Sequence, residues 1–365
     1  MKHILLIVGS QLHINEPFLA YIRSQYLRHF KQSALIFYIR DGDNELPFKI
    51  ENYARRTELI TIIADEANFA TIAKILSTLS NDNLELKDTT LTPSRAKLNA
   101  KDSFVIELEN AKINLLKATP TQILPPFLLN LESKMLSFNL LDIDKNDALA
   151  TLKELGTTHN VQIIASNILE NLVYVKAISQ KFGQLDGFLA EAKNSFSKHF
   201  INSDNIVEFV VSRLKEKNAS ITLAESCTTG LGACLLGQIS GASEIFSGSV
   251  VSYANNIKNI WLSVDESILN EYGAVSAPCV EAMAKGALNL CGASYALAIS
   301  GIAGPNGGSE QKPVGTVFIA AVSKQSVHSK RLNLSGDRDY IRMQSALSAY
   351  AFFLSSFWDE ICEIS

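Results

Sequence analysis

Hydrophobic positions along the chain fall into short apolar runs separated by stretches with helical spacing. Before residue 120, apolar runs at 4–8, 34–39 and 58–63 alternate with segments in which apolar residues recur every three or four positions. Two neighbouring runs, at 104–108 and 113–116, predict a closing hairpin. Strands that alternate with helices are typical of a parallel sheet covered on both faces. The pattern therefore predicts an α/β fold for this first region.

The pattern changes twice further along the chain. Prolines at 120–126 mark a boundary, and residues 138–199 then read as strand, helix, strand, strand and helix, which predicts a small α+β domain. From about residue 203, strands and helices alternate again. Strands are predicted at 220–224, 247–253, 295–300 and 317–322, and helices at 206–216, 280–291 and 340–361. We therefore predict a multi-domain α/β chain with domains at 1–134, 135–200 and 201–365.

Composition narrows the class of protein. The 365 residues are too many for one ordinary core, and 47% hydrophobic with 19% charged residues is a globular composition. A net charge of -4 gives no general attraction to nucleic acid or to anionic membranes. The five cysteines form no C-x-x-C pair, which disfavours a disulfide framework or a zinc site and predicts a cytoplasmic location. The first apolar run is too short for a signal peptide or a membrane span.

A nucleophile candidate lies where the strand at 220–224 turns into a small-residue helix beginning near Gly230. The turn holds, in order, Glu225, Ser226, Cys227, Thr228 and Thr229. The first N–H groups of a helix have no partner within it and favour negative charge, so a serine or cysteine here would have its oxyanion stabilised. The sequence leaves open whether Ser226 or Cys227 faces a pocket. Ser226 or Thr228 as a simple N-cap is the alternative.

A serine nucleophile needs a base. Only His328 lies clearly within the third region, in a polar stretch after the last predicted strand, so a Ser-His-Asp triad is poorly supported. A lysine whose pKa is lowered by burial can take this role. Lys258 follows the end of the next strand, and parallel strands would bring it to the same sheet edge as Ser226. Lys312 is a second candidate, and either lysine could instead be an exposed charge.

Two further features suit a phosphate-bearing ligand. Residues 301–308 directly follow a buried strand and contain four glycines, which let a backbone approach a ligand and offer N–H groups to an anion. The loop is neither a Walker A loop nor a dinucleotide fingerprint. Arg338 and Arg342, four residues apart, place two guanidinium groups on one helix face. They suit phosphate, or equally a surface network with Asp337 and Asp339.

Together these motifs resemble the CinA (competence/damage-inducible protein A) family, whose C-terminal domain is similar to stand-alone nicotinamide-nucleotide amidases. The matching segments are 224–228, Tyr253 with Asn255 and Lys258, 273–276, 300–305 with Gly307 and Gly308, 312–316 and 336–338. The resemblance covers about residues 203–350. It implies hydrolysis of the carboxamide of nicotinamide mononucleotide to nicotinate mononucleotide and ammonia, in the pyridine nucleotide cycle. It also implies a homodimer without cofactor or metal, and no nucleic-acid or membrane partner.

The resemblance also assigns roles to residues. It implies that Ser226 is the nucleophile. With the residue patterns above, we predict that Lys258 is the base, that Tyr253 and Asn255 orient the amide or the lysine, and that the start of the helix holds the oxyanion. Substrate binding is assigned to Glu225, Thr228, Gly230, Asn255, Ser276, Gly301, Gly304, Gly307, Gly308, Thr316, Arg338 and Arg342. One departure is Thr229, where the family usually has a second glycine. A β-branched residue held at positive φ there would be strained.

The first 134 residues resemble, weakly, the family's molybdopterin-binding-like N-terminal domain. Segments 9–12, 42–45 and 124–127 fit its pattern, but the family's glycine-rich loop is replaced by residues 62–68, which contain no glycine. We therefore predict a degenerate domain without the ADP-ribose pyrophosphatase activity associated with the family. Residues 135–200 resemble its small linking domain. Two alternative functions are a non-catalytic nucleotide-binding protein linked to competence or DNA damage, and a pyrophosphatase that acts through the N-terminal domain.

Overall fold

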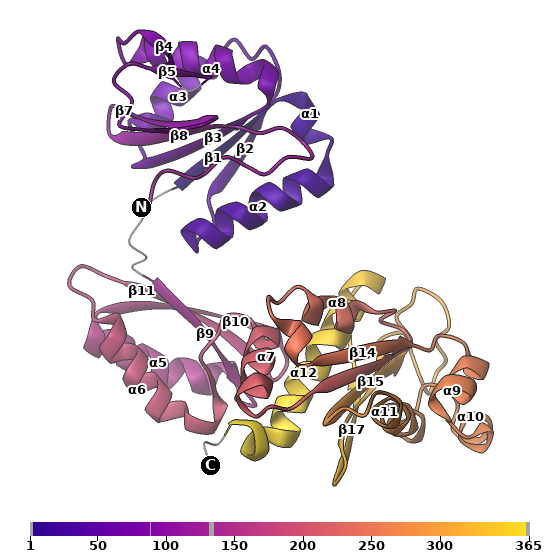
Figure 1. Cartoon of the computed structure of the whole chain (residues 1–365). Coiled ribbons are helices and arrows are strands. Elements are labelled where there is room, and N and C mark those ends of the chain that lie inside the picture. The colour runs from indigo at the N-terminus through magenta and orange to yellow at the C-terminus, as the bar shows by residue number, and fades with distance from the viewer. Residues whose placement is uncertain (1–2, 88, 131–134, 363–365) are drawn as a thin grey trace. The chain divides into compact units, whose positions relative to one another are not determined.

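The computed structural model describes residues 3–87, 89–130 and 135–362 (Figure 1). The chain forms two compact units, Met1–Ser133 and Lys134–Ser365. Both combine helices with sheets, and the first contains the expected parallel strands, so the predicted multi-domain α/β class is confirmed. Among the helices of the described residues, none combines the length and apolar character needed to cross a bilayer.

The first unit is built on a six-stranded sheet of order β2-β1-β3-β8-β7-β6. Its strands are β1 (His3–Val8), β2 (Leu35–Ile39), β3 (Leu59–Ala64), β6 (Leu98–Ala100), β7 (Ser103–Leu108) and β8 (Ala111–Lys117). The helices are α1 (Ser10–His13), α2 (Glu16–Phe30), α3 (Leu46–Ala54) and α4 (Glu66–Leu79). The four strands β2, β1, β3 and β8 run parallel, and β7 closes the predicted hairpin antiparallel to β8. Because separate apolar clusters cover the two faces, β1 and β3 are buried along their whole length.

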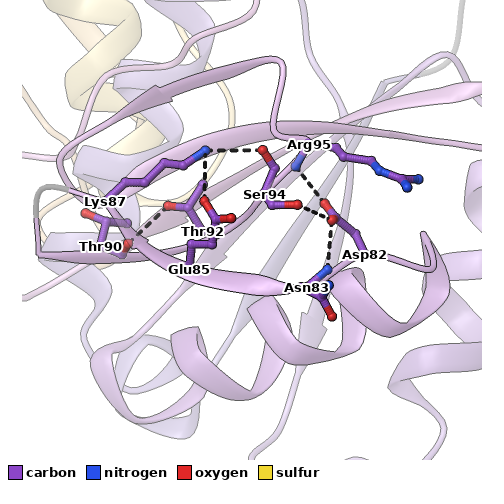
Figure 2. Close-up of polar contacts among 8 residues, drawn as sticks. All are labelled: Asp82, Asn83, Glu85, Lys87, Thr90, Thr92, Ser94 and Arg95. Carbon is purple, nitrogen blue, oxygen red and sulfur yellow. Dashed lines mark hydrogen bonds and ion pairs between the residues drawn. The ribbon is translucent and has the colours of Figure 1, made fainter.

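A second hairpin, β4 (Leu84–Lys87) with β5 (Thr90–Pro93), was not predicted from the sequence. Polar contacts rather than an apolar run define it (Figure 2). The Asp82 carboxylate accepts hydrogen bonds from the Ser94 hydroxyl at 2.5 Å and from the Arg95 and Asn83 N–H groups at 2.8 and 2.7 Å. Each strand spans only four residues, so its alternation of apolar and polar residues rests on two positions of each kind and gives a weak signal in the sequence.

The second unit begins with an antiparallel sheet of order β10-β11-β9-β12. Its elements are β9 (Met135–Leu141), α5 (Lys145–His159), β10 (Val161–Leu169), β11 (Leu172–Ser179), α6 (Leu185–Phe196), η1 (Ser197–His199) and β12 (Phe200–Ile201). This is the predicted strand-helix-strand-strand-helix order. Helices α5 and α6 cover one core, while Leu141, Leu172 and Ile201 join the core of the sheet that follows. A separate linking domain at 135–200 stays a prediction.

The same unit contains a five-stranded sheet of order β14-β13-β15-β16-β17. Its strands are β13 (Ile221–Glu225), β14 (Phe246–Val251), β15 (Tyr295–Gly301), β16 (Thr316–Ser323) and β17 (Val327–Asn333). The helices are α7 (Ile206–Glu216), α8 (Leu231–Gly237), η2 (Ala242–Glu244), α9 (Asn255–Leu262), α10 (Glu266–Glu271), α11 (Ala277–Cys291) and α12 (Arg338–Cys362). Helices α7 and α12 pack on one face and α11 on the other (Figure 1).

Strand β13 lies between β14 and β15 and runs parallel to both, with Glu225 paired with Val251 and Ile299. The carboxyl ends of the three strands therefore meet at one edge of the sheet, as predicted for the segments that carry Ser226 and Lys258. Strand β17 is a correction, since the stretch around His328 was expected to be a solvated segment after the last strand. It is an edge strand whose residues are mostly exposed, so it carries no alternating apolar pattern.

Candidate active site

A cavity of about 240 Å³ opens at the carboxyl ends of β13, β14 and β15. Ligands of open α/β sheets characteristically bind at this position. The cavity is lined by Ser226, Cys227, Tyr253, Asn255, Lys258, Ala274, Val275, Ser300, Gly301, Ile302, Ala303, Gly304, Asn306, Gly307 and Arg338. These residues come from five separate segments, and they include Ser226, Cys227, Tyr253, Asn255, Lys258, Gly301, Gly304, Gly307 and Arg338, which the sequence had singled out individually.

The Ser226 hydroxyl and the Lys258 amine are in direct contact at the floor of this cavity. Ser226 follows the last residue of β13, and Lys258 lies in the first turn of α9, which begins shortly after β14. The Lys258 Nζ atom lies 3.1 Å from Ser226 Oγ, 2.7 Å from the Ser252 carbonyl oxygen and 2.9 Å from the Tyr253 carbonyl oxygen. Both side chains are buried, with exposed fractions of 8% for Ser226 and 1% for Lys258.

These contacts suit a lysine that acts as a base. Burial lowers the pKa of Lys258 from its usual value of 10.5, because the charged amine loses its hydration. In the neutral amine, two hydrogens can point at the Ser252 and Tyr253 carbonyl oxygens. The lone pair then faces Ser226 Oγ and can accept its proton. The arrangement can therefore activate a serine without a histidine, and among the described residues no histidine lines the cavity.

Cys227 also lines the cavity, but its thiol is poorly suited to be the nucleophile. Its side chain is 5% exposed, and burial raises the pKa of the thiol to about 12. A thiol with such a pKa is almost entirely protonated at neutral pH, and only the thiolate is an effective nucleophile. The contact of Ser226 with Lys258 and the raised pKa of the Cys227 thiol together favour Ser226, where the sequence left both residues open.

Glu225 satisfies the N-terminus of α8 and does not line the cavity. Its carboxylate accepts hydrogen bonds from the N–H groups of Gly232 at 3.0 Å and Ala233 at 2.9 Å, and the side chain is fully buried. The N–H groups of Leu231 and Cys234 donate to the carbonyl oxygens of Thr228 and Gly230. The expectation that the first N–H groups of this helix hold an oxyanion is therefore wrong, because the chain supplies its own anion there.

Other backbone donors lie beside the nucleophile. Among the described residues, the N–H groups of Cys227 and Thr228 donate to no carbonyl or side chain of another residue. The N–H groups of Ser226 and Thr229 donate to the carbonyl oxygens of Ile299 and Ser226. Backbone N–H groups immediately after a nucleophile are well placed to stabilise the oxyanion formed by its attack. Cys227 and Thr228 therefore replace the helix N-terminus as the candidate oxyanion donors.

Thr229 has a left-handed backbone, with φ of 51°. A β-branched residue in this region is unusual and carries strain of roughly 1–3 kcal/mol. The positive-φ conformation anticipated as strained is thus the one that Thr229 adopts. Arg342 contacts this turn and not the cavity, because its guanidinium donates to Thr229 Oγ1 at 2.7 Å and to the Thr228 carbonyl oxygen at 3.0 Å.

Arg338 and the glycine loop also line the cavity. The Arg338 guanidinium donates to the Gly304 carbonyl oxygen at 2.7 Å, which ties the loop to the first turn of α12. Gly304 and Gly307 have φ values of 79° and 92°, so both need the left-handed region that glycine adopts easily. The rest of the exposed guanidinium remains available to an anion in the cavity.

Several expected binding residues lie just outside the cavity. They are Glu225, Thr228, Gly230, Ser276, Gly308, Thr316 and Arg342. Ser276 caps α11 by accepting from the Cys279 N–H at 3.4 Å, and Gly230 precedes α8 at a positive φ of 88°. Thr228 and Thr316 are buried. A Cβ on Gly308 would lie 2.9 Å from the Val314 nitrogen, so this glycine permits close packing of the loop.

The other candidates for the base and for orientation also have definite positions. Lys312 donates to the Tyr272 carbonyl oxygen and does not line the cavity. His328 lies on β17 against Phe357. Tyr253 and Asn255 both line the cavity, and Tyr253 is 58% exposed at its rim. Tyr253 contacts Lys258 through its carbonyl oxygen and not through its hydroxyl.

Sequence reasoning missed the backbone acceptors and the small side chains that shape the cavity. The Ser252 carbonyl oxygen fixes Lys258, and Ser300 Oγ donates to the Ala274 carbonyl oxygen at 2.7 Å, which holds the 274–275 segment in the wall. A main-chain carbonyl has no signature in the amino-acid sequence. Ser300 carried one weak signal, because it is the polar residue that ends a buried apolar strand.

In the first unit, polar groups at the ends of β1 and β3 satisfy one another. The Asp41 carboxylate accepts from the Ser10 N–H at 3.2 Å and from the Asn68 side-chain amide at 2.7 Å. Asp65 caps α4 by accepting from the Asn68 N–H at 3.0 Å. The Ser10 N–H and the Asn68 donors at this edge of the sheet are therefore bonded to carboxylates of the chain.

Comparison with known proteins gives one consistent result for the C-terminal part of the chain. Residues 203–357 match the family model described as the CinA C-terminal domain. The CinA-like protein of Thermotoga maritima is 41% identical over 167 residues, 45% of this chain and 41% of that protein. The CinA-like protein of Thermotoga neapolitana is 46% identical over 149 residues, 41% of this chain and 36% of that protein. The chain thus spans about two fifths of the length of these relatives.

Among solved structures, the competence/damage inducible protein CihA from Agrobacterium tumefaciens is 33% identical. It covers 41% of this chain and 92% of its own, with a TM-score of 0.41. A CinA superfamily protein from Klebsiella pneumoniae is 32% identical, covering 42% of this chain and 96% of its own, also with a TM-score of 0.41.

Proposed function

We propose, from the premise that this chain belongs to the CinA family through residues 203–357, that it is a serine amidohydrolase acting on nicotinamide mononucleotide. The products are nicotinate mononucleotide and ammonia, which places the reaction in pyridine nucleotide recycling. The observation that carries the proposal is the 3.1 Å contact between Lys258 Nζ and Ser226 Oγ inside a cavity walled by a glycine loop and Arg338. Ammonia release from this nucleotide by the purified protein tests it.

In the first half of the reaction, neutral Lys258 takes the Ser226 hydroxyl proton while Ser226 Oγ attacks the carboxamide carbon. The carbonyl π electrons move onto oxygen, and the N–H groups of Cys227 and Thr228 stabilise that oxyanion. When the intermediate collapses, the C–N bond breaks and Lys258 returns the proton to the departing nitrogen. Ammonia leaves, and the nicotinate carbonyl remains as an ester on Ser226.

In the second half, water replaces ammonia at the same position. Lys258 takes one proton from the water while the water oxygen attacks the ester carbon. The bond between that carbon and Ser226 Oγ then breaks, and Lys258 delivers the proton to Oγ. The chain is regenerated and nicotinate mononucleotide is released, so the reaction consumes one nucleotide and one water. We further propose that the working protein is a homodimer that uses no cofactor.

Arg338 and the glycine loop are proposed to hold the phosphate and ribose. Replacing Arg338 with alanine should raise KM by roughly tenfold or more, because a charge-assisted contact to phosphate is lost. The value of kcat should fall much less, since in the proposed binding mode the arginine contacts the phosphate and not the carboxamide. Steady-state kinetics on Arg338→Ala measure both constants, and Arg338→Lys is the matched control that retains the charge.

The same proposal predicts that nicotinamide riboside, which lacks the phosphate, is a poor substrate of the wild-type protein. The difference between mononucleotide and riboside should shrink in Arg338→Ala, since the anchor that distinguishes them is gone. Equal turnover of the two substrates by wild-type protein would contradict a phosphate-reading role for this wall of the cavity.

The first unit is expected not to hydrolyse ADP-ribose. Residues 62–69 contain no glycine, and the Ser10 and Asn68 N–H groups near the ends of β1 and β3 are bonded to Asp41 and Asp65. A phosphate arriving there would meet the like charges of Asp41 and Asp65. The assay is AMP formation from ADP-ribose by the full chain with magnesium, manganese or cobalt supplied. Robust metal-dependent turnover, retained in Ser226→Ala, would show that this unit is a working pyrophosphatase.

A further inference from the structure

We propose that Arg342 is a positioning residue that holds the nucleophile turn through Thr229, and not a phosphate ligand. The inference rests on the proposed function in one respect, namely that Ser226 is the nucleophile. It assigns to Arg342 the role of fixing residues 226–230, while Arg338, one helical turn earlier, remains with the substrate. The two arginines of α12 thus serve different loops of one cavity.

The contacts of Arg342 all point to the turn or to its own helix. Its guanidinium donates to Thr229 Oγ1 and to the Thr228 carbonyl oxygen, and its third contact is with Asp339 at 3.1 Å. The side chain is partly buried and does not line the cavity. A planar guanidinium can donate to a hydroxyl and to the preceding carbonyl at once, which fixes both the position and the orientation of the peptide between them.

The backbone conformation of Thr229 explains why the turn needs the contact with Arg342. With φ of 51°, the residue occupies a region that β-branched side chains avoid, so the turn would relax toward an ordinary conformation if nothing held it. The hydroxyl of Thr229 supplies the acceptor through which Arg342 holds it. The residue that introduces the strain therefore also provides the bond that opposes it.

Relaxation of the turn would reach the nucleophile directly. The Thr229 N–H donates to the Ser226 carbonyl oxygen at 3.1 Å, and the candidate oxyanion donors of Cys227 and Thr228 lie between these two residues. A change in φ at Thr229 reorients those N–H groups and moves Ser226 away from Lys258. Displacements of about 1 Å at a reacting group can lower a rate on the order of 100-fold.

A mutant cycle tests the inference. Arg342→Met retains much of the side-chain length without its donors, and kcat should fall on the order of 100-fold while KM for the mononucleotide changes little. Arg342→Lys keeps a cationic donor but not the planar guanidinium, and it should lie between Arg342→Met and wild type. The informative variant is Arg342→Met combined with Thr229→Gly. Glycine accepts positive φ without strain, so the double variant should recover at least tenfold in kcat over Arg342→Met.

Controls separate this role from the alternatives. Thr229→Gly alone completes the cycle, and Arg213→Met on α7, an arginine paired with Glu216, should leave kcat unchanged. Arg342 would be a phosphate ligand if Arg342→Met had a higher KM and no longer preferred the mononucleotide over the riboside. In that case Thr229→Gly should not rescue the variant. A kcat that simply follows the loss of Tm, again without rescue, would make it only a support of the fold. Either result overturns the inference.

The reactivity of Ser226 in the same set of variants can also be measured without any nucleotide. A small uncharged sulfonyl fluoride labels the serine, and peptide mass spectrometry locates the label. If wild-type protein releases no ammonia but labelling falls in Arg342→Met and returns in the double variant, the positioning role stands and the proposed substrate fails. Wild-type protein that is neither active nor labelled at Ser226 would overturn both.

Discussion

Ser226→Ala is expected to abolish ammonia release, with a loss on the order of 10⁴-fold or more, while the fold remains intact. The reason is direct, because the variant lacks the oxygen that contacts Lys258 and would form the ester. Only one small polar atom is removed from a nearly buried position. Turnover and thermal unfolding measured on the same preparation should therefore give a dead protein with a near-normal Tm.

Cys227→Ala is the matched comparison, since it changes the neighbouring residue that the sequence could not separate from Ser226. It should retain most of the activity, because the thiol has a raised pKa of about 12 and the backbone N–H at this position is kept. An inactive Cys227→Ala together with an active Ser226→Ala would reverse the assignment of the nucleophile.

Lys258→Arg is expected to lose activity by about 10²- to 10⁴-fold at every pH tested. Arginine keeps the positive charge and the donors, but its guanidinium stays protonated across the accessible range and cannot take the Ser226 proton. The variant therefore separates the base from a merely cationic role. Activity close to wild type in Lys258→Arg would show that a charge, and not a base, is needed at this position.

The pH dependence of the activity of the wild-type protein should follow the titration of Lys258. Burial lowers the pKa of Lys258, and the neutral amine is the form that can accept a proton. Activity should therefore rise with pH through this lowered pKa and level off above it, with the inflection of kcat/KM below 10.5. A profile that falls as pH rises over this range would require the protonated lysine, which contradicts the proposed role.

Much of the C-terminal fold could be predicted because its strands are short apolar runs bounded by polar turns. Strand β15 was predicted at 295–300 and extends over Tyr295–Gly301, and the helix predicted at 206–216 is α7 (Ile206–Glu216). Edge elements escaped prediction. Strand β17 is mostly exposed, so its sequence carries no alternation, and the hairpin β4–β5 depends on the contacts of Asp82.

The site was predictable as a set of segments but not as a set of contacts. Parallel strands that follow one another place Ser226 and Lys258 at one sheet edge, and this topology could be inferred from the pattern alone. The roles of Glu225 and Arg342 could not be inferred in this way. In the sequence, a carboxylate that accepts from the N–H groups of the following helix looks the same as one that faces a ligand. Only tertiary structure shows which groups are already satisfied.

The most direct test of the central claim is to incubate the purified protein with nicotinamide mononucleotide and to measure ammonia and nicotinate mononucleotide together. A serine amidohydrolase should release one ammonia for each nicotinate mononucleotide formed, and the Ser226→Ala protein should release neither. Calorimetry on the same samples reports whether the nucleotide binds. Binding of the nucleotide to the wild-type protein without release of ammonia would contradict catalysis and favour a nucleotide-binding regulatory protein.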